Sequence, residues 1–243
     1  MDESWVKKYS PVFELLIFWG LLNVISGAIA GVVFKPFGSP EKWVEHATFL
    51  IQMFVGVGLF VFTAEKYGFT LISVLISLKE EIRGAVVAAG KYFLIYICML
   101  AIAVMTLSAV LYILSSGGDQ GLASGILGVN KDIFRFNSLV VSAPGGYAFY
   151  LLGACLVSPV IEEVFYRRLL FGELRRNFGF TAAAVISACI FAVFHPNVVG
   201  SLIAGAYLAY SYEKGKSLAT NIILHSLLNL LDISVIFLLF RRG

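Results

Sequence analysis

Long apolar runs separated by short polar connections recur along the chain from residue 11 to residue 240. A helix that spans the hydrocarbon core of a membrane needs about 20 predominantly apolar residues, or a few less where protein shields it. By this measure the chain contains seven predicted spans, at residues 11–33, 44–63, 86–114, 147–166, 180–195, 197–213 and 218–240. The pattern predicts an all-α fold, a polytopic transmembrane helical bundle.

Two connections between these spans are long. Residues 64–85 contain the mixed-charge stretch LKEEIRG, which predicts either a turn at the cytoplasmic interface or an extension of the third helix. Residues 115–146 are rich in Gly and Ser and form the longest predicted loop. No polar block is long enough to predict a separate soluble domain, so we expect one membrane domain.

The composition supports a membrane protein. Of the 243 residues, 59% are hydrophobic and 14% are charged, whereas a soluble globular domain carries about 25% charged residues. The formal net charge is only +3, and Lys and Arg lie at the ends of the predicted spans without forming a basic patch. We therefore expect an integral, multi-pass protein in contact with the lipid bilayer, and we do not expect nucleic acid as a partner.

The distribution of Lys and Arg predicts the orientation of the chain. With a cytoplasmic N-terminus, twelve of the 18 Lys and Arg residues fall on the cytoplasmic side and six on the other. Lys7 and Lys8 precede an apolar run of about 23 residues without a small-residue cleavage motif. We expect this run to be a retained helix and not a signal peptide.

The cysteines and one histidine show no pattern that indicates chemistry. Cys98, Cys155 and Cys189 lie in apolar stretches without CxxC spacing, and we interpret them as small core residues. His46 lies in a predicted loop beside Glu45, and we expect it to be solvated.

Two adjacent glutamates close the fourth predicted span, in the stretch SPVIEEVFYRR. An ionisable side chain at bilayer depth costs about 3 kcal/mol or more, so it indicates a functional site. Adjacent helical residues point about 100° apart, whereas residues four apart share a face. Glu163 is therefore predicted to form a structural ion pair with Arg167. Glu162 faces Tyr166 and has no obvious local partner, which makes it the candidate for chemistry, although two interfacial glutamates beside arginines would explain the stretch equally well.

His195 closes the fifth predicted span and precedes Pro196, which biases it away from helical geometry. A histidine at such a break can point into a cavity, and Phe191, one turn earlier, can pack beneath its ring. The simpler interpretation is a satisfied polar group at a helix end.

The last predicted span carries a polar stripe. Asn221, His225 and Asn229 recur at every fourth position, with Asp232 three further on, and Leu, Ile and Val fill most of the rest. Hydrogen bonds between membrane helices would explain the asparagines well and the histidine less well.

Together these polar residues could form one site in the bundle core, where helical proteins build catalytic sites. A glutamate beside a histidine can hold a water molecule and remove its proton, while a second histidine and an amide can donate to the oxyanion. The set predicts hydrolysis in an intramembrane polar cavity. The chain has no GxSxG motif and no cysteine next to a histidine, so no nucleophilic site competes.

Three motifs on the predicted spans, EEVFYR (162–167), FAVFH (191–195) and HSLLN (225–229), resemble a known family. They are similar to the EExxxR, FxxxH and HxxxN motifs of the CAAX protease and bacteriocin-processing family of intramembrane proteases, also called the CPBP or Abi family. The resemblance divides the chain into N-terminal helices and loop (1–146) and catalytic core helices (147–243).

The resemblance implies an activity and a set of roles. The family cleaves peptide bonds near the C-terminus of membrane-associated substrates, prenylated CAAX proteins in the eukaryotic branch, from a cavity open to the cytoplasm. A peptide or protein substrate, with or without a lipid, is the implied partner. The family's functional residues carry over to the matching positions: Glu162 with His195 to activate water, His225 with Asn229 to bind the oxyanion, and Glu163 with Arg167 in support.

Two histidines and a glutamate also make a legitimate catalytic zinc set, which would be Glu162, His195 and His225. However, the HExxH spacing is absent and asparagine is a poor zinc ligand. The sequence favours a site without a metal or cofactor, with zinc as the alternative.

Two other classes of function compete with a protease. A non-catalytic membrane scaffold or immunity protein would gain nothing from keeping such costly polar groups. A proton-coupled transporter also uses intramembrane Glu and His, but it would show paired broken helices in two matching halves, which we do not find here.

Overall fold

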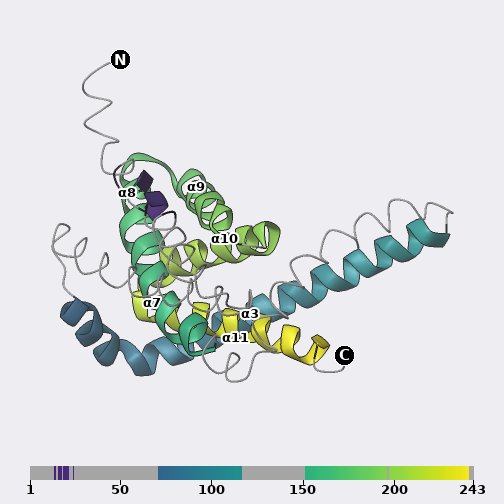
Figure 1. The fold of residues 1–243 in the computed structure, drawn as a ribbon, viewed down its shortest axis with the longest axis horizontal. Coiled ribbons are helices and arrows are strands. Elements are labelled where there is room, and N and C mark those ends of the chain that lie inside the picture. The colour runs from purple at the N-terminus through teal and green to yellow at the C-terminus, as the bar shows by residue number, and fades with distance from the viewer. Residues whose placement is uncertain are drawn as a thin grey trace, which may run out of the picture.

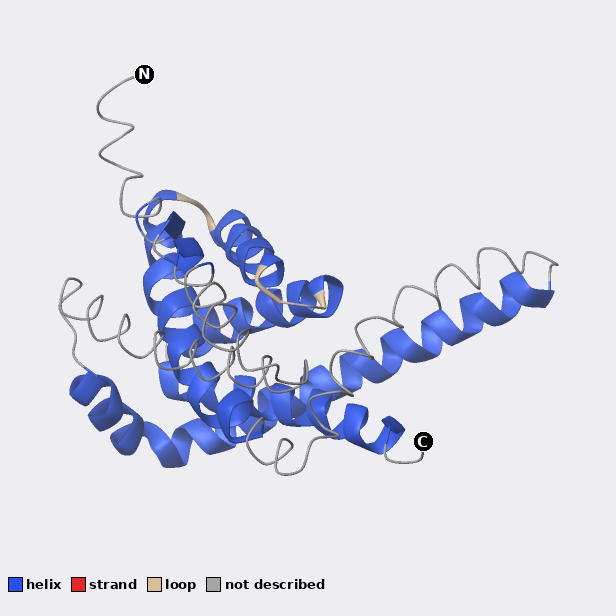
Figure 2. Ribbon diagram, viewed as in Figure 1, coloured by secondary structure: helices blue, strands red, loops and turns tan. Residues whose placement is uncertain are grey.

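The described part of the chain is helical. The computed structural model describes scattered helical positions between residues 14 and 24, and then residues 71–116, 151–195 and 197–240. Within these residues there is no strand, and only short loops join the helices (Figure 2), which confirms the all-α expectation for them. The predicted span at 44–63, most of the span at 11–33 and nearly all of the loop at 115–146 lie outside the described residues.

The longest helix, α3 (Leu71–Ser116), contains the predicted third span and begins well before it. The stretch LKEEIRG is therefore part of this helix and not a turn. α3 crosses α11 (Leu218–Phe240), where Ala89 packs against Leu224 and Leu228. Beyond the crossing, the C-terminal half of α3 extends away from the other described helices (Figure 1).

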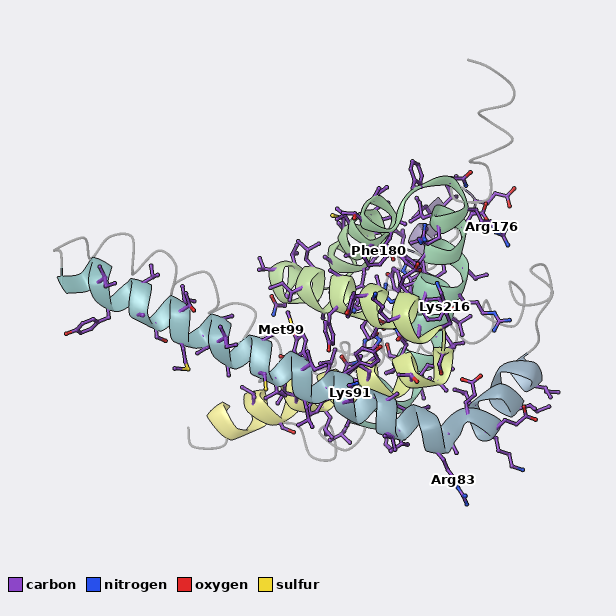
Figure 3. All side chains as sticks on the ribbon, turned by 180° about the vertical axis from the view of Figure 1, so that it is seen from behind. Arg83, Lys91, Met99, Arg176, Phe180 and Lys216 are labelled. Carbon is purple, nitrogen blue, oxygen red and sulfur yellow. The ribbon has the colours of Figure 1, made fainter. Side chains whose placement is uncertain are left out.

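Exposed apolar side chains cover that half of α3, and Met99, labelled in Figure 3, is one of them. Two helices among the described residues are long and apolar enough to cross a bilayer, over Leu78–Val110 in α3 and Leu218–Val235 in α11. An exposed apolar surface of this kind suits hydrocarbon and not water. The described helices are thus those of a helical membrane protein.

One helical stretch carries both glutamates and changes its hydrogen-bond register along its length. It consists of η2 (Gly153–Val157), α7 (Ser158–Glu163), η3 (Val164–Phe171) and α8 (Gly172–Asn177), where η denotes a π-helix. π-helical turns are rare and frequent at functional sites. The helix continues past residue 166, where the predicted span ends, through Arg167, whose side chain is buried and paired with Glu163.

α9 (Phe180–Val193) and α10 (Val198–Gly215) pack closely against each other. Gly205 of α10 makes this approach possible: a Cβ atom there would lie 3.1 Å from the Phe191 ring and 3.2 Å from the Cα atom of Ala188. The position of Phe191 therefore depends on Gly205 in the neighbouring helix.

Asn197 caps α10 by accepting a hydrogen bond from the Gly200 N–H at 3.0 Å.

We expect Gly205→Leu to destabilise the protein by about 1–3 kcal/mol, because the added side chain would overpack the contact between α9 and α10. Thermal unfolding in detergent would show this as a lower melting temperature. Gly84→Leu on α3 is the matched control, since a Cβ atom at Gly84 meets nothing within 4 Å. Equal melting temperatures of the two variants would contradict the close approach.

Polar contacts join the ends of these helices. Lys216 ends α10 in a left-handed conformation with φ of 52°, and the Ser217 hydroxyl then donates to Glu81 of α3 at 2.6 Å. Arg175 of α8 donates to Glu213 of α10 from Nη2 at 3.0 Å and from Nε at 3.3 Å. These bonds raise the pKa of Arg175 above its ordinary value. They hold α8 and α10 together at the end of the bundle opposite the loop at Asn197.

Candidate active site

A fully buried carboxylate, that of Glu163, joins two helical segments at the centre of the site. Its Oε2 atom accepts hydrogen bonds from Nε of Arg167 at 3.2 Å and from Nδ2 of Asn221 at 3.0 Å. Its Oε1 atom accepts a hydrogen bond from Nδ1 of His225 at 2.9 Å. The predicted ion pair between Glu163 and Arg167 is confirmed, and both side chains are 0% exposed.

The neighbouring carboxylate, that of Glu162, has two oxygens in different environments. The Ser158 hydroxyl, one turn earlier, donates to Oε1. Oε2 is buried, has no hydrogen bond within the described residues, and lies 3.4 Å from Nε2 of His195 and 3.8 Å from Nε2 of His225. The expectation that Glu162 has no local partner is wrong for Oε1, because a serine four residues earlier shares its helix face.

His195 lies just beyond the last residue of α9, at the predicted break. Its Nδ1 atom donates to the carbonyl oxygen of Phe191 at 2.6 Å, and its ring stacks on the Phe191 ring with centroids 4.0 Å apart. The prediction that Phe191 packs beneath the imidazole is confirmed. Phe191 also meets the ring of His225 edge-on at 5.7 Å, so one buried aromatic ring supports both histidines.

The hydrogen bonds at Nδ1 decide which nitrogen of each histidine faces Glu162. The acceptor is a carbonyl oxygen for His195 and a carboxylate for His225, so Nδ1 carries the hydrogen in both rings. In the neutral rings each Nε2 atom then has a lone pair. Oε2 of Glu162 and the Nε2 atoms of His195 and His225 are therefore three acceptor atoms that face one another. The arrangement suits a molecule that donates hydrogen bonds, such as water, or a positively charged group.

The three side chains differ in their exposure. Those of His225, Glu162 and His195 are 3%, 15% and 26% exposed, respectively. The cluster is thus closed on the side of His225 and more open on the side of His195.

Asn229 lies one turn beyond His225 on α11, and its described hydrogen bond leads away from the cluster. Its Nδ2 atom donates to the carbonyl oxygen of Ala154 in η2 at 2.7 Å. This contact holds α11 against the helix that carries the glutamates. Its role at an oxyanion stays a prediction.

Three serines that complete this site were not predicted from the sequence. Ser187 of α9 accepts a hydrogen bond from Nη1 of Arg167 at 3.2 Å, and Ser211 of α10 donates to Oδ1 of Asn221 at 2.8 Å. Helix periodicity could have identified the third, Ser158, because it lies four residues before Glu162. No spacing could have identified Ser187 and Ser211, since they belong to other helices.

Comparisons with known proteins agree with the three motifs. A family model described as Rce1-like, type II CAAX prenyl endopeptidase Rce1-like, matches residues 144–231. This range contains every residue of the cluster and confirms the resemblance to CAAX proteases over the core helices.

One curated relative is YdiL of Bacillus subtilis (strain 168), whose name assigns it provisionally as a membrane peptidase. It is 28% identical over 82 residues, which cover 32% of this chain and 34% of YdiL. The match thus spans about a third of the relative's length. No solved structure matches the chain. The comparisons support a membrane protease.

Proposed function

We propose that this chain is an intramembrane endopeptidase that hydrolyses a peptide bond near the C-terminus of a membrane-associated peptide or protein. The observation that carries the proposal is the convergence of Oε2 of Glu162 with the Nε2 atoms of His195 and His225. The match to Rce1-like endopeptidases supports a peptide substrate. It favours a protease over a scaffold or a transporter.

In the proposed reaction, Glu162 acts as the general base on a water molecule. The attacking water molecule would donate its two hydrogens to Oε2 of Glu162 and to Nε2 of His195. Oε2 takes the proton, because Ser158 already donates to Oε1. The water oxygen forms a bond to the carbonyl carbon, and the electron pair of the C=O bond moves to the carbonyl oxygen. The electron pair on the oxyanion then re-forms the C=O bond as the C–N bond breaks, and the proton on Glu162 passes to the leaving nitrogen. The products are a carboxylic acid and an amine, which become a carboxylate and an ammonium group when the acid's proton moves to the amine.

The oxyanion formed in this reaction needs hydrogen-bond donors. His225 can donate from Nε2 only when its ring is doubly protonated, because its Nδ1 hydrogen bonds to Glu163. In the proposed reaction the neutral ring therefore takes up a proton from solvent at Nε2 when the substrate binds, and it releases this proton with the products. Glu163 orients the ring and offsets its positive charge, as the aspartate does in a Ser-His-Asp triad. Asn229 would supply a second donor from its amide group, and the pair forms the proposed oxyanion site.

Zinc is the alternative to this metal-free reaction. The donor types of the cluster are those that zinc accepts, and each histidine has a second hydrogen bond at Nδ1. However, the chain lacks the HExxH spacing, and the asparagine beside these residues is a poor zinc ligand. We therefore propose a glutamate-type site without a metal. If the activity needs zinc, its ligands would be Glu162, His195 and His225.

The proposal includes a membrane arrangement. We propose seven spans with a cytoplasmic N-terminus, as the Lys and Arg distribution favours, and a polar cavity around Glu162 that opens toward the cytoplasm. Substrates would enter beside His195, the most exposed member of the cluster.

The test is cleavage of quenched C-terminal peptides by the purified full chain and by Glu162→Ala. Each peptide is offered in a prenylated and a plain form, with and without a chelator. We expect turnover by the wild-type chain alone, unaffected by the chelator, and the two peptide forms show whether the substrate needs a lipid. Activity lost with chelator and restored by zinc would select the metal alternative. No turnover of any peptide by the wild-type chain would overturn the proposed protease.

A further inference from the structure

Asn221 lies outside all three family motifs, yet it is fully buried and every polar atom of its side chain is used. Its Nδ2 atom donates to Oε2 of Glu163 at 3.0 Å and to the carbonyl oxygen of Leu208 at 2.8 Å. Its Oδ1 atom accepts a hydrogen bond from the Ser211 hydroxyl at 2.8 Å. One amide thus connects α10 and α11 to the glutamate that orients His225.

The neighbours of Asn221 determine which way its amide points. Two acceptors, from Glu163 and Leu208, face the nitrogen, and the hydroxyl of Ser211 faces the oxygen. An amide rotated by 180° would oppose acceptor to acceptor at two of these contacts. The two acceptors therefore keep the nitrogen directed at Glu163. Ser211, itself buried, holds the amide oxygen, and its hydroxyl also lies 3.0 Å from the carbonyl oxygen of Leu208.

Asn221 and His225 hold Glu163 from one face of α11. They lie four residues apart, and they donate to different oxygens of the same carboxylate, Asn221 to Oε2 and His225 to Oε1. Arg167 also donates to Oε2, but it belongs to the same helical stretch as Glu163 and does not fix the carboxylate relative to α11. Asn221 supplies that cross-helix constraint on Oε2 and so leaves Oε1 for the histidine.

We infer that Asn221, held by Ser211, is a positioning residue that fixes Glu163 and thereby keeps the hydrogen of His225 on Nδ1 and the Nε2 atom toward Glu162. The effect of Asn221 on catalysis rests on the proposed function, whereas its effect on the tautomer of the His225 ring does not. With Asn221 removed, the carboxylate can turn within the space left by the amide, and the His225 ring loses its defined acceptor.

The test is the ring tautomer of His225, measured by ¹⁵N NMR of the full chain labelled at histidine in detergent micelles. The chain has only three histidines, and the signals of His225 are identified by their absence in His225→Gln. We expect hydrogen on Nδ1 in the wild-type chain and a mixture of Nδ1–H and Nε2–H forms in Asn221→Ala. For hydrolysis of a peptide that the wild-type chain cleaves, we expect kcat of Asn221→Ala to fall by about 10-fold or more, with little change in KM.

Two further variants separate positioning from packing. Ser211→Ala removes only the hydroxyl that holds the amide oxygen, and we expect a smaller change of the same kind. Ser226→Ala removes a hydroxyl on the same helix that donates to the Ile222 carbonyl oxygen at 2.8 Å, and we expect the wild-type tautomer and kcat. If Asn221→Ala does not fold, Ser211→Ala provides the same readout.

The outcomes distinguish this inference from the proposed function. A tautomer that stays on Nδ1 in the Asn221 and Ser211 variants overturns the positioning role, whether or not the chain cleaves peptides. A tautomer that changes in a chain without peptidase activity supports the positioning role and overturns the protease.

Discussion

Glu162→Gln is expected to reduce kcat for peptide hydrolysis by about 10³-fold or more while the variant folds normally. An amide cannot accept the proton of the attacking water, which removes general-base catalysis. Its oxygen can still accept the hydrogen bond of Ser158, and its nitrogen can donate to Nε2 of His195, so the local structure has no reason to change. Turnover in detergent checks the lower kcat, and the melting temperature of the same preparation checks that the variant folds normally.

The matched control for this prediction is Glu173→Gln. Glu173 lies on α8 and pairs with Arg176, whose side chain is 78% exposed, away from the cluster. This variant should hydrolyse peptide at the wild-type rate. Glu162→Gln with kcat within 10-fold of the wild-type value would show that another group activates the water.

The second large effect is expected on stability, from Glu163→Ala. Removal of one partner from a buried ion pair costs about 3–5 kcal/mol, because it leaves the other charge buried without compensation. Here it would leave Arg167 fully buried, with donors of Asn221 and His225 also losing their acceptor. Thermal unfolding in detergent should show a melting temperature lower by about 10 °C, together with a loss of activity.

Glu173→Ala is the control for charge removal, since an exposed pair contributes only about 0–1 kcal/mol. The two glutamates of the site provide the sharper comparison. Glu162→Ala should lose activity at a nearly wild-type melting temperature, whereas Glu163→Ala should lose both. Equal melting temperatures for these two variants would contradict the division between a reactive carboxylate and a structural one.

Contacts within one helix could be predicted because helix periodicity decides them. The pair of Glu163 with Arg167 and the packing of Phe191 beneath His195 are both four residues apart, and both are present in the structure. The same periodicity contained the signal for Ser158, which was overlooked.

Helix boundaries were predictable only where polarity changes along the chain. α11 has the predicted bounds of Leu218–Phe240, because apolar residues fill it and polar residues flank it. The helix that begins before Glu162 continues past residue 166, where the predicted span ends, and Arg167 is buried there against α9 with its Nη1 atom donating to Ser187. A charged residue in a sequence indicates the end of a membrane span only if its side chain is not buried with a hydrogen-bond partner in a neighbouring helix.

By itself the sequence determined the helical class, the polar residues buried among apolar ones and their order along the chain, because these depend on composition and periodicity. Only the tertiary structure decided that Asn221 and His225 bond to different oxygens of Glu163, that Ser211 holds the amide oxygen of Asn221, and that Gly205 lets α10 approach Phe191. These contacts join residues from different helices, and their geometry depends on how the helices pack. No spacing within a single helix encodes that packing.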